Sequence, residues 1–498
     1  MRGSAGGARD GLTAWFREDL PAHLPAWLPT QRWFGGKARV VDRVAVRDVI
    51  WLPGTERPVA VVLVEIGYAP PGPGGPDRCA LLLGLEDTPS DTAIAPAPGG
   101  QDGFVADQAT EGHAVRALLS GLLGGPAPGG VEGGVLVYDD ATPGAREVLA
   151  AAEPPAVRPV GVEQSNTSVR IGTTHVFKLF RRLEAGEHPQ LEVGRALAQA
   201  GFAGVPRLEG SVVYRGTDAQ PSALGALEQW VVNDGDGWHY LLSRLEASRG
   251  DAHVRSRLYA DLETLGATTA DFHAALARNT QLDAFVPEAA TASDAARWQE
   301  AVQTQAARTF ALLEQRRSTL APRDVRRAEA VLDARDNTVR QPPAVDGVAG
   351  FDRIRIHGDY HLGQTLRTPD GFVIVDFEGE PSKPLDVRRQ KQCALKDVAG
   401  MLRSLDYAAA TADLTADAGT AWAAPLPEMR QAFLGGYHRR AARCGGRFVP
   451  SAAGARDAWT SLFELEKALY ELEYELNNRP TWAHIPLAAL PRLLGSPG

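Results

Sequence analysis

The segments HGDYHLGQ at residues 357–364 and VIVDFE at residues 373–378 decide the fold class of this chain. Phosphoryl transfer depends on positioning and charge neutralisation, and it uses a carboxylate to accept the proton of the attacking hydroxyl. We predict that Asp359 is this base. Gln364 ends the same loop and Asp376 ends the next predicted strand, so they can supply the few protein oxygens that Mg²⁺ requires. The two segments therefore predict a magnesium-dependent phosphotransferase.

The elements predicted around these segments change from β-rich to helical along the chain. Branched apolar runs in the first 95 residues predict strands after a helical start around Trp15, and residues 159–180 predict strand, turn and strand. Helical periodicity dominates from about residue 240 and is interrupted by the segment with the two motifs. We expect three parts, namely a cap subdomain at 1–95, an intermediate subdomain at 96–232 completing the ATP-binding lobe, and a helical lobe at 233–498.

Composition and charge exclude some classes of function. The 498 residues carry a net charge of −9 and no long basic run, which argues against a nucleic acid or an anionic membrane as partner. No stretch approaches about 18 consecutive apolar residues, and the N-terminus lacks the apolar core of a signal peptide. The three cysteines are widely spaced, which favours reduced thiols and a cytoplasmic protein.

The pattern HGDxHxGQ followed by IVDFEGEP resembles the catalytic loop of aminoglycoside phosphotransferases. Within that superfamily the sequence is most similar to the actinobacterial maltokinase and glucosamine kinase family, over nearly the whole chain. The similar blocks are LPAWLPTQRWFGGKAR, GVEQSNTSV, RIHGDYHLGQ, DFEGEPSKP, LKDVAGMLRSLDYAA and YELNNRPTW. The resemblance implies an α+β, two-lobed eukaryotic-protein-kinase-like fold with an additional N-terminal β-rich cap. It also implies Asp359 as base and Asp376 as a metal ligand, with Gln364 replacing the usual loop asparagine and Glu378 as a further candidate ligand.

Residues for binding ATP are predicted upstream of the catalytic loop. The resemblance makes Lys178, on a predicted strand, the phosphate-binding lysine and Glu192, near the start of the next helix, its partner. The alternative is a surface lysine and a glutamate favoured by the helix dipole. A polar loop is predicted to cover the phosphates or, alternatively, to be a simple hairpin turn. It consists of Gln164, Ser165, Asn166, Thr167 and Ser168. Residues Glu228 to Val232 are predicted as a hinge that binds adenine through its backbone.

The predicted last long helix, within SLFELEKALYELEYELNNRPTW, is expected to lie beside the sugar acceptor. Its leucines recur at three- and four-residue spacing and predict a core-facing stripe. The leucines are Leu462, Leu465, Leu469, Leu472 and Leu476, and the glutamates are Glu464, Glu466, Glu471, Glu473 and Glu475. We expect most of the glutamates to face solvent and one or two to face the sugar. The candidate sugar contacts are His361, Arg388, Trp459, Glu466 and Trp482, with Trp422 as a further stacking candidate, and each tryptophan has a place in the core as its alternative. The resemblance implies that Asp397 tethers the catalytic loop.

Three classes of function fit a kinase-like chain. An ATP-dependent sugar kinase is favoured over a non-catalytic binding module because Lys178, Asp359, Gln364 and Asp376 are all present. A protein kinase is disfavoured because the glycine-rich loop, the HRD arginine and the APE segment are missing. The resemblance leaves D-glucosamine, phosphorylated at O6, and maltose, phosphorylated at its anomeric hydroxyl, as acceptors. The acidic helix suits an ammonium group and favours glucosamine. We expect a monomer, with a dimer as the alternative.

Overall fold

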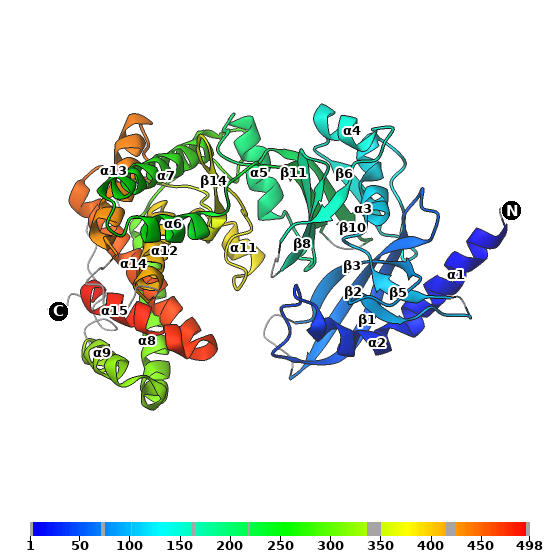
Figure 1. Ribbon diagram of the computed structural model, residues 1–498, viewed down its shortest axis with the longest axis horizontal. Helices are drawn as coiled ribbons and strands as arrows, with labels where there is room; N and C mark the ends of the chain where they lie inside the picture. Colours follow the sequence, from blue (N-terminus) through cyan, green and yellow to red (C-terminus); the bar gives the residue numbers. More distant parts are fainter. Residues whose placement is uncertain are drawn as a thin grey trace. The chain divides into compact units, whose positions relative to one another are not determined.

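The structure is a computed structural model that describes residues 3–70, 75–100, 102–161, 165–217, 220–335, 350–414 and 424–494 (Figure 1). The chain forms two compact units, of which the first contains Met1–Gly194 and Pro206–Val231 and the second contains Arg195–Val205 and Val232–Gly498. The predicted site residue Gln164 and the stacking candidate Trp422 lie outside the described residues.

The first unit begins with an antiparallel sheet of strand order β1-β2-β3-β5-β4. Its strands are β1 (Val40–Trp51), β2 (Val59–Ala69), β3 (Asp77–Glu86), β4 (Ala93–Pro96) and β5 (Phe104–Asp107). The apolar run of β2 is continuous because both faces of this strand are covered. Ala60 and Val62 pack with helices α1 (Gly3–Glu18) and α2 (Leu20–Trp27), whereas Val59 and Val61 belong to a second core on the opposite face.

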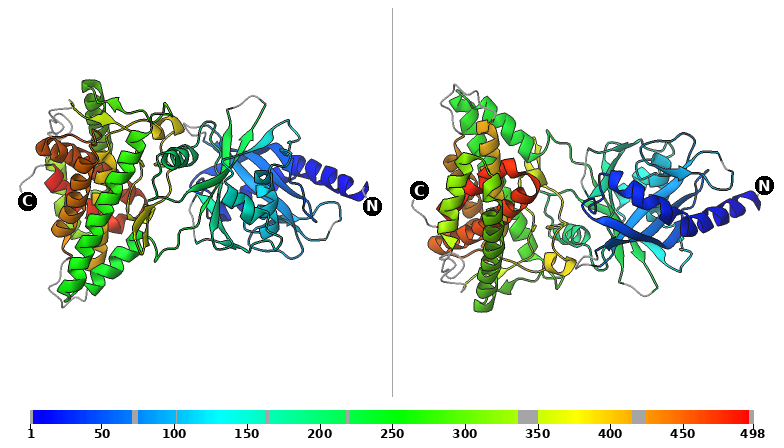
Figure 2. Two further views of the ribbon diagram at one scale, coloured as in Figure 1. Left: turned by 90° about the horizontal axis from the view of Figure 1, so that it is seen from above. Right: turned by 90° about the horizontal axis from the view of Figure 1, so that it is seen from below.

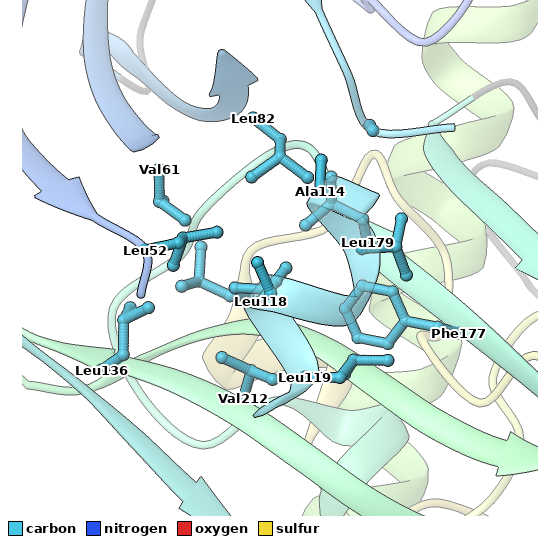
Figure 3. Packing of buried hydrophobic residues seen from close by; sticks show 14 of the residues in the cluster. Leu52, Val61, Leu82, Ala114, Leu118, Leu119, Leu136, Phe177, Leu179 and Val212 are labelled. Atoms are coloured by element: carbon cyan, nitrogen blue, oxygen red, sulfur yellow. The ribbon is translucent and has the colours of Figure 1, made fainter. Parts of the chain in front are cut away.

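A second antiparallel sheet, of order β6-β10-β11-β9-β8-β7, completes the first unit. Its strands are β6 (Val135–Asp139), β7 (Val157–Pro159), β8 (Asn166–Ile171), β9 (His175–Phe180), β10 (Leu208–Arg215) and β11 (Ser222–Gln229), and the helices beside it are α3 (Gly112–Leu119), α4 (Pro143–Leu149) and α5 (Pro189–Gln199). Figure 3 shows Leu118 of α3 between Val61 of the first sheet and Val212 of the second. The two sheets therefore share one hydrophobic core.

The second unit is mainly helical. Its helices are α6 (Gly237–Ala247), α7 (Ala252–Arg278), α8 (Ala292–Arg316), α9 (Pro322–Asp333), α11 (Leu385–Arg388), α12 (Leu395–Leu414), α13 (Leu426–Arg443), α14 (Ala453–Asn478) and α15 (His484–Leu493). Helices α7 and α13 pack side by side (Figure 2), and α14 packs against both α8 and α12. The hairpin of β14 (Thr365–Thr368) and β15 (Gly371–Ile374) lies between these helices in sequence, and β12 (Glu288–Ala289) pairs with β13 (Asp352–Arg353).

Short 3₁₀ turns complete the list of elements. They are η1 (Leu28–Thr30), η2 (Ser120–Leu123), η3 (Arg317–Thr319), η4 (Leu362–Gln364) and η5 (Pro480–Trp482). Within the described ranges no helix is both long enough and apolar enough to cross a membrane.

The elements agree with the sequence predictions except in the polar segment before Lys178. That segment was predicted as a loop, but Asn166, Thr167 and Ser168 form the start of β8 and pair with β9. Considered without their neighbours, asparagine, threonine and serine are residues that favour turns. Pairing with a strongly apolar neighbour strand outweighs this local preference.

Candidate active site

A buried carboxylate of helix α12 holds the catalytic segment. Asp397 accepts hydrogen bonds from the backbone N–H groups of His357 (2.8 Å) and Gly358 (2.9 Å) and from the ring of His273 (3.0 Å). Burial by itself raises the pKa of Asp397, but the hydrogen bond and charge of His273 and the Gly358 amide outweigh it and hold the pKa below its ordinary value. The predicted tether is thus confirmed, and it fixes the two residues before Asp359.

The rest of the loop packs closely on the same helix. A Cβ at Gly400 would lie 2.6 Å from the carbonyl oxygen of Tyr360, so only glycine permits this approach. The loop then turns into η4, where the ring Nδ1 of His361 accepts a hydrogen bond from the Gly363 N–H at 3.1 Å. Burial lowers the pKa of His361, which favours the neutral ring that can accept this bond. His361 therefore shapes the loop.

Gln364 and Asp376 meet at the end of the hairpin. The side-chain amide of Gln364 donates a hydrogen bond to Asp376 Oδ2 at 2.9 Å. Asp376 has a φ of 68°, in the left-handed region that is costly by about 1–3 kcal/mol for a residue other than glycine. Strain of this kind concentrates at functional sites, so the backbone conformation supports a functional carboxylate here.

The donor set at this point fits Mg²⁺. A carboxylate and an amide oxygen are hard ligands, and Mg²⁺ usually completes its octahedron with phosphate oxygens and water. Within the described residues no group of three or more His, Cys, Asp or Glu side chains could hold a metal. Gln364 and Asp376, which offer an amide oxygen and a carboxylate, are the residues that would hold the ion. The main chain of Glu378, the third predicted ligand, accepts a hydrogen bond from Arg388 at 3.0 Å.

A polar cavity of about 760 Å³ opens beside the catalytic loop, within the second unit. Asp359 lies in its wall together with residues of α8, α11 and α12. One face of α14 forms the opposite lining, and its residues are Phe463, Glu466, Lys467, Tyr470 and Glu473. The Nζ atom of Lys467 lies 3.5 Å from Asp359 Oδ1. The predicted base thus faces a cavity of the size that holds small organic ligands.

The ammonium of Lys467 forms an ion pair with the predicted base. Burial alone would lower its pKa, but the carboxylates of Asp359, Glu471 and Glu380 outweigh burial and raise the pKa above its ordinary value. Lys467 is therefore charged throughout the physiological range. Its position allows it to contact an oxygen of a bound acceptor or to stabilise the ionised form of Asp359.

The cavity includes two of the five predicted sugar contacts. Arg388 and Glu466 line it, whereas His361, Trp459 and Trp482 do not. The prediction for Trp459 is wrong because its ring is completely buried against the rings of Trp298 and Phe463 and presents no face to a sugar. Trp482 stacks on Tyr407 with ring centroids 6.4 Å apart.

The acidic helix α14 does not present the solvated face expected from the sequence. Glu464 pairs with Arg430 (2.8 Å), Glu466 with Lys396 (3.0 Å), Glu471 with Arg403 (2.8 Å), and Glu475 with Arg479. Glu473 accepts a hydrogen bond from Gln305. These carboxylates therefore stabilise the packing of α14 against its neighbours, since buried charges are tolerated when they are paired. The predicted leucine stripe is confirmed as fully buried.

The predicted nucleotide residues lie in the first unit. Lys178 is on β9, between β8 and β11, and Glu192 is in the first turn of α5 and is buried. Glu228 is the penultimate residue of β11 and accepts a hydrogen bond from Gln190 of α5 at 2.6 Å. Val232 is strongly exposed and is the first residue of the second unit after β11. Ser165, before β8, is exposed.

The side chains of β8 divide between two faces. Ser168 is directly opposite Lys178 and Thr167 is directly opposite Leu179, so each pair shares one face of the sheet. Leu179 belongs to the core shared with the first sheet. The hydroxyl of Thr167 accordingly points away from the face of Lys178, contrary to its predicted role over the phosphates, while Asn166 and Ser168 share the face of Lys178.

The sequence prediction missed most of the lining of this cavity. Lys467 and Tyr470 were not singled out, and Glu473 was named only among the glutamates of the helix, although with Phe463 and Glu466 they recur at the spacing of one helical face. This second stripe, polar and aromatic beside the leucine stripe, was the available signal. The contributions of α8, such as Glu300 and Arg308, had no such signal.

Comparisons with known proteins agree with this arrangement. The maltokinase N-terminal cap domain matches residues 27–122, and the phosphotransferase enzyme family matches residues 156–379. Glucosamine kinase of Mycolicibacterium smegmatis (strain ATCC 700084 / mc(2)155) is 30% identical over 338 residues, which are 68% of this chain and 79% of that protein. The chain belongs to this phosphotransferase family. A glucosamine kinase of Streptacidiphilus jiangxiensis is likewise 30% identical over 371 residues, 71% of this chain and 78% of that protein.

Solved structures of this family share the fold. A glucosamine kinase in complex with glucosamine, ADP and inorganic phosphate superposes with a TM-score of 0.62 at 23% identity, covering 94% of this chain and 97% of that chain. A further crystal form of a glucosamine kinase gives a TM-score of 0.64 at 23% identity, with 96% and 99% covered. The predicted family and the predicted kinase-like fold with an N-terminal cap are both confirmed.

Proposed function

We propose that this phosphotransferase transfers the γ-phosphate of Mg-ATP to a hydroxyl group of a small sugar. The observation that carries the proposal is the place of Asp359 in the wall of the 760 Å³ cavity, on a loop whose end holds Gln364 beside Asp376. Asp359 would accept the proton of the sugar hydroxyl, and Gln364 and Asp376 would hold the Mg²⁺ that neutralises phosphate charge. Lys178 would bind the phosphates of the nucleotide, with Glu192 as the partner of its ammonium group.

We further propose D-glucosamine as the acceptor and glucosamine 6-phosphate as the product. Two relatives at 30% identity are glucosamine kinases, and a structure of the same fold is a complex with glucosamine and ADP. Glu466 and Glu473 offer carboxylate oxygens on the cavity face of α14. A charge-assisted hydrogen bond from the sugar ammonium to one of them would add about 1.5–3 kcal/mol. We expect a monomer acting in the cytoplasm, where ATP is available.

Maltose is the second candidate because the cavity is not acidic overall. Six basic and six acidic side chains line it, and Lys467, beside Asp359, would repel a nearby ammonium group. A volume of 760 Å³ lies in the upper part of the range for small-molecule pockets and leaves room for a second sugar ring. A neutral disaccharide meets no charge penalty in such a site.

A side-by-side acceptor panel tests both proposals. We would measure kcat/KM for glucosamine, N-acetylglucosamine, glucose and maltose at saturating Mg-ATP, with Asp359→Asn as the inactive control. Loss of the base is expected to lower kcat by about 10²–10⁴ while MgADP still binds. Glucosamine should exceed glucose at least threefold. A best rate with maltose would select the second candidate, and no sugar-dependent turnover by the wild type would contradict the proposed function.

A further inference from the structure

The first sheet and the strands that carry the proposed nucleotide residues meet at a buried arginine. Strand β9 leaves the second sheet after Phe180, and the chain then pairs with β3 of the first sheet through the hydrogen bonds Ala80 N to Arg181 O (2.9 Å) and Leu183 N to Arg78 O (2.8 Å). Arg181 lies at this crossing, and only 3% of its surface is exposed. The residue three positions after Lys178 thus belongs to both sheets.

The guanidinium of Arg181 contacts both sheets at once. It pairs with Asp107, the last residue of β5, at 2.6 Å and donates from Nε to the Thr167 hydroxyl on β8 at 2.8 Å. A third contact, from Nη1 to the Ala80 carbonyl, measures 3.4 Å, and the group lies 4.8 Å from the ring centroid of Trp33. A planar guanidinium with several fixed N–H directions can satisfy such divergent partners, whereas a lysine ammonium is a point charge.

The hydrogen bond from Arg181 to Thr167 fixes which face of the sheet each residue at the start of β8 occupies. Because its hydroxyl is bonded to Arg181 on the cap side, its neighbours Asn166 and Ser168 are held on the opposite face, with Lys178. Strand β8 lies near the edge of its sheet and has only the short strand β7 outside it. An anchor on the cap side therefore limits the movement of the start of β8.

We infer that Arg181 is a positioning residue for nucleotide binding, through which the cap sheet holds strand β8 and its Lys178-facing side chains in register for the phosphates. This inference rests on the proposed function of that face in binding ATP. Arg181 itself is predicted to touch no substrate. Its effect is expected on nucleotide affinity and not on sugar affinity, because all residues lining the acceptor cavity belong to the second unit.

The test is calorimetric titration of MgADP into the full-length wild type, Arg181→Lys and Arg182→Lys. Arg181→Lys retains the charge beside Asp107 but cannot also reach Thr167 and Ala80. The matched control changes the next residue, which is exposed and pairs with Asp77 at 3.5 Å. We expect the dissociation constant of MgADP to rise about three- to tenfold in Arg181→Lys, an effect of the size of one ordinary intramolecular hydrogen bond. The control should bind like the wild type.

The sugar kinetics and a second variant make the test decisive. The KM for the sugar should stay unchanged in Arg181→Lys, which a general loss of structure would not allow. If that variant does not fold, Asp107→Asn, which keeps the shape of the partner and removes its charge, gives the same comparison. Wild-type affinity for MgADP in the folded variant, or an equal rise in the sugar KM, overturns the inference. Absence of MgADP binding by the wild type would contradict the proposed function instead.

Discussion

Gln364 and Asp376, the proposed Mg²⁺ ligands, are joined by one hydrogen bond. We predict that Asp376→Ala raises the Mg²⁺ concentration for half-maximal activity about tenfold or more, and that Gln364→Ala raises it less. A charged oxygen binds a hard cation more strongly than an amide oxygen does. The measurement is a Mg²⁺ titration of initial rate at fixed ATP. Asp370→Ala, an exposed aspartate in the turn of the same hairpin, is the control. An unchanged Mg²⁺ requirement in Asp376→Ala would contradict the assignment of Asp376 as a Mg²⁺ ligand.

Lys467 lies 3.5 Å from the predicted base and lines the cavity beside it. We predict that Lys467→Met lowers kcat/KM at pH 7 about tenfold or more, because a charged donor at this place would hold an oxygen of the acceptor next to Asp359. The control is Lys391→Met, whose lysine pairs with Glu288 outside the cavity and should leave kcat/KM unchanged. A wild-type kcat/KM in Lys467→Met would mean that this lysine does not contact the acceptor.

Helix α12 acts on the catalytic loop through its first turn. Asp397 is buried and receives three hydrogen bonds, two from the loop backbone and one from His273 of α7. We predict that Asp397→Asn lowers the free energy of unfolding at pH 7 by about 3 kcal/mol, the cost of breaking a buried charged network. The kcat should also fall, because the loop that carries Asp359 loses its anchor.

The pH dependence of this stabilisation follows from the sign of the shift. The pKa of Asp397 is lower in the folded chain than its ordinary value of 3.8, so its contribution is complete above that value and is lost as the pH falls through the folded pKa. The difference between wild type and Asp397→Asn should therefore shrink below about pH 4. Urea unfolding at pH 7, 5, 4 and 3 measures it, with the exposed Asp333→Asn as control. A difference that stays constant to pH 3 would contradict the ionised tether.

Helix α14 shows how one element serves two purposes. Its leucine stripe is buried in the core, and the adjacent stripe containing Glu466 and Lys467 lines the cavity beside Asp359. A third group of side chains, the glutamates Glu464 and Glu475, forms ion pairs with arginines of the same unit. Fixing the helix on several sides gives the cavity face a defined position, which a specificity site requires.

The first unit is held together by one core between its two sheets. Leu118 is fully buried there (Figure 3), and its truncation leaves a cavity. We predict that Leu118→Ala lowers the free energy of unfolding by about 3 kcal/mol. We also predict that both sheets lose hydrogen-exchange protection together. Mass-spectrometric hydrogen exchange on the full chain makes the measurement. Leu123→Ala, at a leucine that is 41% exposed, should change little. Loss of protection in the first sheet alone would show that the cap unfolds independently.

The sequence was most informative where the functional residues lie close together along the chain. Asp359, Gln364 and Asp376 fall within one loop and one hairpin, so their relation follows from local geometry that a motif can reveal. The alternating and continuous apolar runs likewise predicted the strands, and the leucine spacing predicted the core face of α14. These features depend on backbone periodicity, which the order of apolar and polar residues along the chain encodes directly.

Only the tertiary structure decided which polar residues reach the acceptor and which face each strand residue takes. Lys467 meets Asp359 across more than 100 residues, Trp459 is buried by Trp298 and not open to a sugar, and Thr167 is bonded to Arg181 on the cap side. Each outcome depends on the neighbour that covers a given face. That neighbour is selected by the packing of the whole unit, where burial of apolar surface outweighs the preference of any single polar side chain.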